Sequence, residues 1–124
     1  MYGSTLAFWP SIKSCGDGLF IPSVGPGYDD TPVRPWNSVN TKHRNNGDYY
    51  RDMWKAALNI GAEIVSITSF NEWHEGTQIE AAIQKDGYED YGTDPDFYLK
   101  LTKEMVQQMK VSPVCFNNLI GGLL

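Results

Sequence analysis

The run from Glu63 to Phe70 is the feature that most constrains the fold of this chain. Half of its residues are β-branched, which is typical of a strand buried in a parallel sheet. The preceding segment predicts a helix from about Asp48, because apolar residues recur there at three- and four-residue spacing before a stop at Gly61. These apolar positions are Tyr50, Met53, Trp54, Ala57 and Leu58. The order of helix and then buried strand indicates an α/β fold.

A second strand and a second helix extend this pattern. The apolar run Leu19 to Val24 is closed by Gly25-Pro26-Gly27, which predicts a buried strand that leads into a loop over Tyr28 to Asn46. Downstream, Asp94-Pro95 supplies an N-cap and a first-turn proline for another helix. The apolar positions of that helix are Phe97, Leu101, Met105 and Met109.

Repeated strand–helix order implies parallel strands joined by right-handed crossovers, as in a doubly wound sheet or a (β/α)8 TIM barrel. A complete barrel needs about 250 residues. The 124 residues of this chain therefore predict the last third to half of a barrel. We assign this unit to residues 1–110 and a divergent tail to residues 111–124, where the helical periodicity is lost.

Charge and hydropathy exclude several classes of protein. The formal charge of −5 and the pI near 4.8 come without a cluster of Lys and Arg, so a nucleic-acid surface is not expected. The sequence predicts neither a membrane span nor a signal peptide. Cys15 and Cys115 match no metal or redox spacing, and we interpret them as free thiols, with a single disulfide as the alternative.

Two glutamates follow the Glu63–Phe70 strand directly. Glu72 and Glu75 lie in the segment Asn71-Glu72-Trp73-His74-Glu75-Gly76, and the carboxyl ends of parallel strands are where α/β folds build active sites. Glycosidases need one proton donor and one carboxylate that acts as nucleophile or base. If both carboxylates face one pocket, their mutual repulsion would keep one of them protonated as the general acid.

Two other interpretations of this segment remain open. Glu72 and Glu75 could be solvated loop residues with Trp73 in the core, or His74 could join both glutamates as a metal site. The metal interpretation lacks a second histidine at ligand spacing, because His43 stands alone in a polar loop and is expected to be solvated.

The earlier loop, Gly25 to Asn37, carries three prolines among aromatic and charged residues. Aromatic faces and planar polar groups bind sugars, so Tyr28, Trp36 and Arg34, together with Asp30, form a candidate sugar-binding set. In the alternative interpretation, Trp36 packs in the core and Arg34 pairs with Asp30 for structural reasons.

Both loops resemble the endo-α-1,2-mannosidases of glycoside hydrolase family 99. The matching segments are Tyr2 to Thr5, Trp9-Pro10, Phe20 to Tyr28, Arg34 to Asn37, Asn40-Thr41, Asn46-Gly47, Tyr49-Tyr50 and Ile67 to Glu80. The resemblance covers most of the chain and implies the C-terminal part of a (β/α)8 barrel.

The resemblance also implies a reaction and roles for residues. The family cleaves α-1,2-mannosidic bonds in N-glycans and releases glucosylated mannose with retention of configuration. The residue matching Glu75 is the general acid/base, and the residue matching Glu72 is a base on the sugar's own 2-hydroxyl, giving a 1,2-anhydro sugar. Arg34, Tyr28, Asn71, Trp36 and His74 are expected to bind substrate.

The partner implied is a glucosylated high-mannose N-glycan or a related mannoside, and the family implies the Golgi lumen or membrane and neither a metal nor an organic cofactor. The upstream strands of the barrel are expected to carry further sugar-binding residues, so this chain would hold part of a cleft. A non-catalytic carbohydrate-binding fragment of the same fold is therefore the alternative function.

Overall fold

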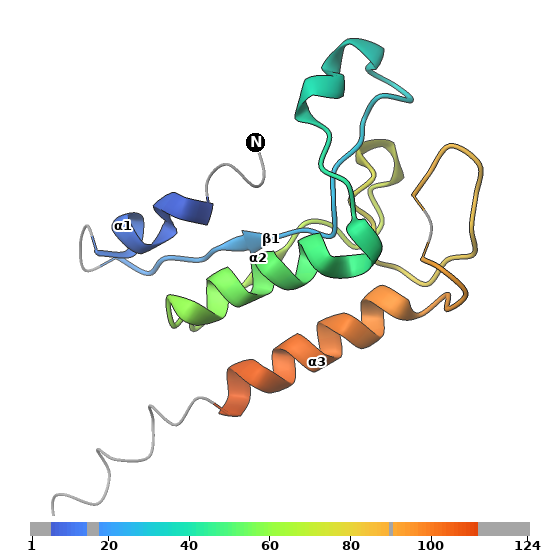
Figure 1. Cartoon of the computed structure of the whole chain (residues 1–124). Helices are drawn as coiled ribbons and strands as arrows, with labels where there is room; N and C mark the ends of the chain where they lie inside the picture. Colours follow the sequence, from blue (N-terminus) through green and yellow to red (C-terminus); the bar gives the residue numbers. More distant parts are fainter. Residues whose placement is uncertain (1–5, 15–17, 90, 112–124) are drawn as a thin grey trace, which may run out of the picture.

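The computed structural model describes residues 6–14, 18–89 and 91–111, and it consists of helices around a small parallel sheet (Figure 1). Cys15, Cys115 and residues 112–124 of the expected tail lie outside these described residues, whereas Val111, the first residue of that tail, is the last residue of helix α3. The elements in chain order are η1 (Leu6–Phe8), α1 (Trp9–Ser14), β1 (Ser23–Val24), η2 (Pro35–Asn40), η3 (Asn45–Gly47), α2 (Asp48–Asn59), β2 (Ser66–Ile67), η4 (Trp73–Glu75) and α3 (Phe97–Val111).

The two strands pair in parallel, with Ser23 opposite Ser66 and Val24 opposite Ile67. The expected α/β class is confirmed, but both strands are shorter than the sequence predicted. The ladder extends only through the bonds from Ser66 N to Pro22 O (3.0 Å) and from Thr68 N to Val24 O (2.8 Å). Regular strand structure is limited to this short overlap because each strand has a single neighbour within the described part of the chain.

Helix α2 forms and ends as its sequence predicts. Four of the five expected apolar residues, Tyr50, Met53, Trp54 and Ala57, are buried, and Leu58 is half-buried. Gly61 has a φ of +62°. The bonds from Gly61 N to Leu58 O (2.9 Å) and from Ala62 N to Ala57 O (3.2 Å) form a Schellman motif. The glycine stop is thus confirmed.

Helix α3 runs in the same direction as α2 and packs beside it (Figure 1). It begins at Phe97, later than the Asp94-Pro95 start that the sequence predicted, and Asp94 caps the preceding turn by accepting a bond from Asp96 N at 3.0 Å. Leu101 and Met105 are buried as expected, and Tyr98, which the periodicity did not single out, is fully buried between the two helices. Parallel strands followed by parallel helices define two consecutive β/α units.

The sheet is covered on one face only. Val24 packs in the core, whereas Ile21 and Ile64, on the opposite face, are 45% and 48% exposed. Phe70 is also exposed, so the expectation of a strand buried throughout is wrong within this chain, because no described element covers that face. No helix in the described residues is both long and apolar enough to cross a membrane.

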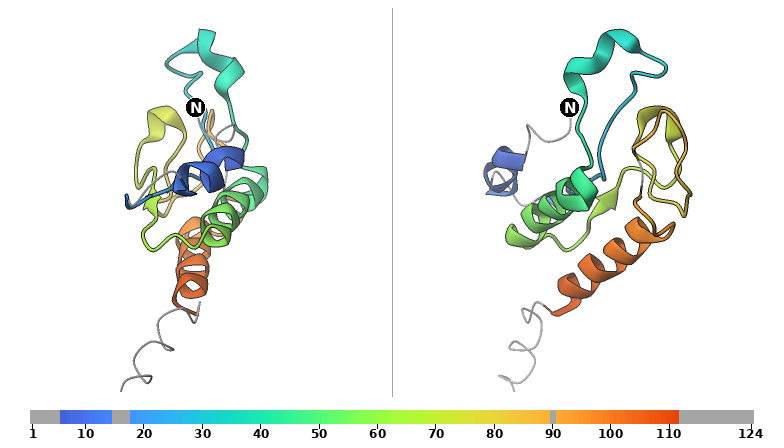
Figure 2. Two further views of the ribbon diagram at one scale, coloured as in Figure 1. Left: turned by 90° about the vertical axis from the view of Figure 1, so that its left-hand side faces the viewer. Right: turned by 45° about the vertical axis from the view of Figure 1, so that its right-hand side comes forward.

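Two long connections rise from the carboxyl ends of the strands (Figure 2). One joins β1 to α2 and contains η2 and η3, so the expected loop over Tyr28 to Asn46 is partly helical. An antiparallel bridge between Tyr28 and Lys42 closes its base. The other joins β2 to α3 and carries η4, which places both candidate loops at the same end of the sheet.

Candidate active site

The backbone turns sharply after β2 and returns on itself around Glu72. Ser69 N donates to Thr77 O at 2.9 Å, and the hydroxyls of Ser69 and Thr77 lie 2.8 Å apart. Ser69 Oγ also accepts from Glu72 N at 2.9 Å. The peptide between Thr68 and Ser69 is cis. The hydrogen bonds of Ser69 anchor the segment that carries both glutamates to the end of the strand.

Glu72 caps the short helix η4. Its Oε1 accepts a bond from His74 N at 3.0 Å and lies 3.6 Å from His74 Nδ1. The Glu72 side chain remains 48% exposed and that of His74 74% exposed. The glutamate is therefore oriented by the backbone and open to a ligand on its outer side.

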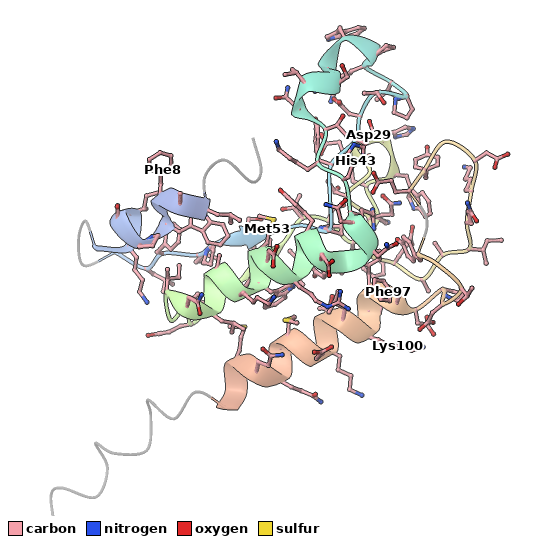
Figure 3. All side chains as sticks on the ribbon, in the orientation of Figure 1. Phe8, Asp29, His43, Met53, Phe97 and Lys100 are labelled. Carbon is pink, nitrogen blue, oxygen red and sulfur yellow. The ribbon has the colours of Figure 1, made fainter. Side chains whose placement is uncertain are left out.

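Glu75 connects the two loops. Its carbonyl accepts from Asp29 N at 2.9 Å, and its Oε1 lies 3.9 Å from Arg34 Nη1. Its side chain is 37% exposed. Gly76 follows with a φ of +60°, and a Cβ there would lie 3.0 Å from both Asp29 N and Asp29 O. The approach of Asp29, labelled in Figure 3, thus depends on a glycine after Glu75.

Asp30 organises the earlier loop from a buried position. It is 1% exposed and accepts bonds at 2.9 Å from Arg34 Nη1 and from Asn37 Nδ2. Burial alone would raise the pKa of Asp30, but hydrogen bonds from Arg34, Asn37 and Tyr28 outweigh it and hold that pKa below the ordinary value. The hydrogen bond with Asp30 raises the pKa of Arg34 in turn. Arg34 is therefore a fixed cation between Asp30 and Glu75.

Tyr28 belongs to the same group of charges. Burial raises the pKa of its hydroxyl, and the hydrogen bond to Asp30 and the negative charges of Asp30 and Glu75 act in the same direction. The structure thus brings Tyr28, Arg34 and Glu75 close to one another. It also includes the Arg34–Asp30 pair that the alternative, structural interpretation expected.

Trp36 does not pack in the core. It belongs to η2, the helix at the outer end of its loop (Figure 1). Its side chain is 80% exposed. Asn71 is likewise exposed, and its carbonyl accepts from Trp73 N at 3.1 Å. Both side chains are accessible, and neither forms a contact with the Asp30–Arg34–Glu75 group within the described part of the chain.

The sequence did not predict the contacts that hold Trp73 or any role for Arg44. Trp73 is fixed by a hydrogen bond from its Nε1 to Glu80 and by an edge contact with the Tyr88 ring at 5.3 Å. Arg44 is buried and donates to the backbone carbonyls of Gly76 and Gln78. Their partners are remote in sequence or are backbone atoms, so residue patterns could not reveal them.

His43 and His74 do not share a metal site. His43 contacts Glu89, which corrects the expectation of a simply solvated histidine, although its side chain is 71% exposed. Within the described residues, no three His, Cys, Asp or Glu side chains gather closely enough to hold a metal ion. His74 pairs with Glu72 and not with both glutamates.

Fold and site together define two β/α units that carry a carboxylate-rich loop at the strand ends, a class typical of glycosidases. The model of glycosyl hydrolase family 99 matches residues 1–111. The chain belongs to this family.

Similar proteins that carry a name support this family membership. A glycoprotein endo-alpha-1,2-mannosidase of Xenopus laevis is 56% identical over 83% of this chain and 25% of its own length. A human glycoprotein endo-alpha-1,2-mannosidase-like protein is 52% identical over 86% of this chain and 25% of its own. The solved family 99 endo-alpha-mannosidase of Bacteroides thetaiotaomicron superposes with a TM-score of 0.80 at 52% identity, covering 86% of this chain and 36% of that one. The chain thus spans about a quarter of these curated relatives.

Proposed function

We propose that this chain is the C-terminal part of the (β/α)8 catalytic barrel of an endo-acting glycosidase. The uncovered sheet face supports this, because Ile21 and Ile64 would be buried by the remaining strands and would line the barrel interior. The matched relatives are long enough to contain these further strands, because this chain covers only 25% of one and 36% of another. Residues 112–124 are proposed to lie outside this domain, one residue later than the sequence indicated, because α3 and the family match both end at residue 111.

The proposed substrate is a glucosylated high-mannose N-glycan cleaved at an α-1,2-mannosidic bond, with release of glucosylated mannose in the Golgi lumen. The observation that carries the proposal is the contact of Glu75 with Arg34 and with the backbone of Asp29. This contact joins a carboxylate at one strand end to a polar, aromatic loop at the next.

In the proposed mechanism, Glu75 donates a proton to the departing glycosidic oxygen. Glu72 removes the proton of the 2-hydroxyl, whose oxygen attacks the anomeric carbon as the glycosidic bond breaks, giving a 1,2-anhydro sugar. Water then attacks the anomeric carbon, Glu75 accepts the proton of the water, and Glu72 returns its proton to the 2-oxygen. Two displacements at one carbon retain its configuration.

A chimera tests this function. Residues 1–111 of this chain replace the matching segment of the Bacteroides thetaiotaomicron endo-alpha-mannosidase, which restores a complete barrel around the glutamates of this chain. We expect release of glucosylated mannose with retained configuration, measured by NMR. A folded chimera that binds the mannoside but releases no product would instead support the carbohydrate-binding alternative.

A substrate without the 2-hydroxyl tests whether Glu72 acts as a base or as a nucleophile. The 2-deoxy analogue should not be cleaved by the chimera, because it has no oxygen to attack the anomeric carbon. Cleavage of this analogue at the rate of the parent substrate would contradict the 1,2-anhydro route and make Glu72 a nucleophile.

Trp36 is proposed to stack on a sugar of the bound glycan. Replacing it with alanine in the chimera should raise KM on the order of tenfold and leave the melting temperature unchanged, since the side chain is 80% exposed. Steady-state kinetics and calorimetry measure both quantities. Val39→Ala, also on η2 and 84% exposed, is the matched control, and an equal effect of both changes would rule out stacking.

Asp30 should make the stability of the chimera depend on acid pH. A carboxyl group whose pKa is lowered on folding stabilises the fold above its unfolded pKa, and this contribution is lost as pH falls through the lower folded value. Because the ordinary value is 3.8, the melting temperature of Asp30→Asn should lie below that of the parent at pH 5 to 7, and the difference should shrink below about pH 4.

Thermal unfolding at a series of pH values measures this difference. Asp52→Asn is the control, because the pair of Asp52 with Lys55 at 3.4 Å lies on the exposed side of α2. A difference between parent and Asp30→Asn that stays constant down to pH 2 would show that the Asp30 charge does not stabilise the fold.

A further inference from the structure

Arg44 lies beneath the loop that carries Glu75. The residue is 3% exposed, and its Nη2 donates to Gly76 O at 3.0 Å and to Gln78 O at 2.8 Å. The loop therefore rests on one guanidinium immediately after the glutamate.

The Arg44 guanidinium also packs against two tyrosine rings. Its central carbon lies 4.6 Å from the centroid of the Tyr98 ring and 5.3 Å from that of Tyr91. The Tyr91 hydroxyl donates to Gln78 O at 3.1 Å, and Arg44 N donates to Glu89 at 2.6 Å. Arg44 is thus fixed between the start of α3 and the Glu75 loop.

No carboxylate of the described residues lies within ion-pairing distance of this buried guanidinium, and its Nη1 is buried without a hydrogen-bond partner among them. A buried cation is costly unless it is compensated, and well-packed apolar side chains often stabilise a fold as well or better. What an apolar side chain could not supply is the pair of hydrogen bonds to the loop carbonyls.

We propose that Arg44 is a positioning residue for Glu75. Two consecutive carbonyls are fixed, that of Glu75 by Asp29 N and that of Gly76 by Arg44. These bonds set the height of the Glu75 backbone over the core and therefore the reach of its carboxyl group toward Arg34 and the substrate. The inference rests on the proposed function and adds a residue that acts through the backbone and does not touch the substrate.

Arg44→Lys in the chimera tests the inference. Lysine keeps the charge but loses the planar guanidinium, so the loop should shift. We expect kcat per active site to fall at least tenfold with KM changed less than threefold, and backbone amides of residues 72–78 to exchange hydrogen faster. Arg51→Lys is the control, since Arg51 pairs with Asp48 at 3.2 Å on α2, and it should change neither quantity.

Two results would overturn the inference. One is a lower melting temperature with unchanged kcat per active site, which marks a purely structural arginine. The other is unchanged amide exchange of residues 72–78, a readout that decides the matter even if the parent chimera is inactive and the proposed function fails. If Arg44→Lys does not fold, Arg44→Gln enters the same assays, because its amide can bond one carbonyl. If neither variant folds, Arg44 is a requirement of the core and the positioning role is rejected.

Discussion

Replacing Glu75 with glutamine in the chimera should lower kcat at least a hundredfold, the usual scale of general acid catalysis. Glutamine preserves the shape of the side chain and can still contact Arg34 Nη1, which lies 3.9 Å from Glu75 Oε1. It cannot donate a proton to the departing oxygen or accept one from water. The loss should therefore fall on the chemical step and not on binding.

Steady-state kinetics and calorimetric titration with a glucosylated mannoside separate these effects. We expect the dissociation constant to change less than severalfold while turnover is lost. Glu104→Gln, an exposed position on α3, supplies a control with the same chemical change away from the site. Near-normal turnover of Glu75→Gln would contradict the assignment of Glu75, and an equal loss in Glu104→Gln would point to a general effect on the protein.

Gly76→Ala should impair both stability and activity, because the glycine is where the two loops touch. A left-handed φ costs an L-residue roughly 1–2 kcal/mol. The added Cβ would also lie 3.0 Å from two backbone atoms of Asp29, and relieving such overpacking costs about 1–3 kcal/mol more. The loops would separate, the bond from Asp29 N to Glu75 O would lengthen, and kcat would fall about tenfold to a hundredfold, as expected when a catalytic group is displaced by about 1 Å.

The Gly87→Ala variant distinguishes the cost of a left-handed backbone from the cost of the contact with Asp29. Gly87 has a φ of +86°, yet an added Cβ would meet no atom within 4 Å. This variant should lose only the conformational part of the stability, with turnover preserved. Denaturant unfolding and kinetics of both variants test the comparison, and equal effects at the two glycines would show that the contact between Gly76 and Asp29 does not position Glu75.

Local sequence patterns predicted the helices well. The apolar spacing in α2 and the Gly61 stop depend on interactions within a few residues, and the sequence contains all of them. Strand lengths were overestimated because β-branched runs indicate which residues can form a strand, whereas pairing depends on neighbours. Within the part of the chain that the structure describes, β1 and β2 pair only with each other.

In the candidate site, too, some features follow from the sequence and others depend on contacts between distant residues. The sequence by itself determined which chemical groups follow the strands, Glu72 and Glu75 after one and Tyr28, Asp30 and Arg34 after the other, because their order along the chain sets which strand end they occupy. Only the tertiary structure decided that Arg34 stands between Asp30 and Glu75, that Trp36 is exposed, and that Arg44 supports the loop from below. These contacts join residues through space, often through backbone carbonyls, and a carbonyl is the same at every position of a sequence.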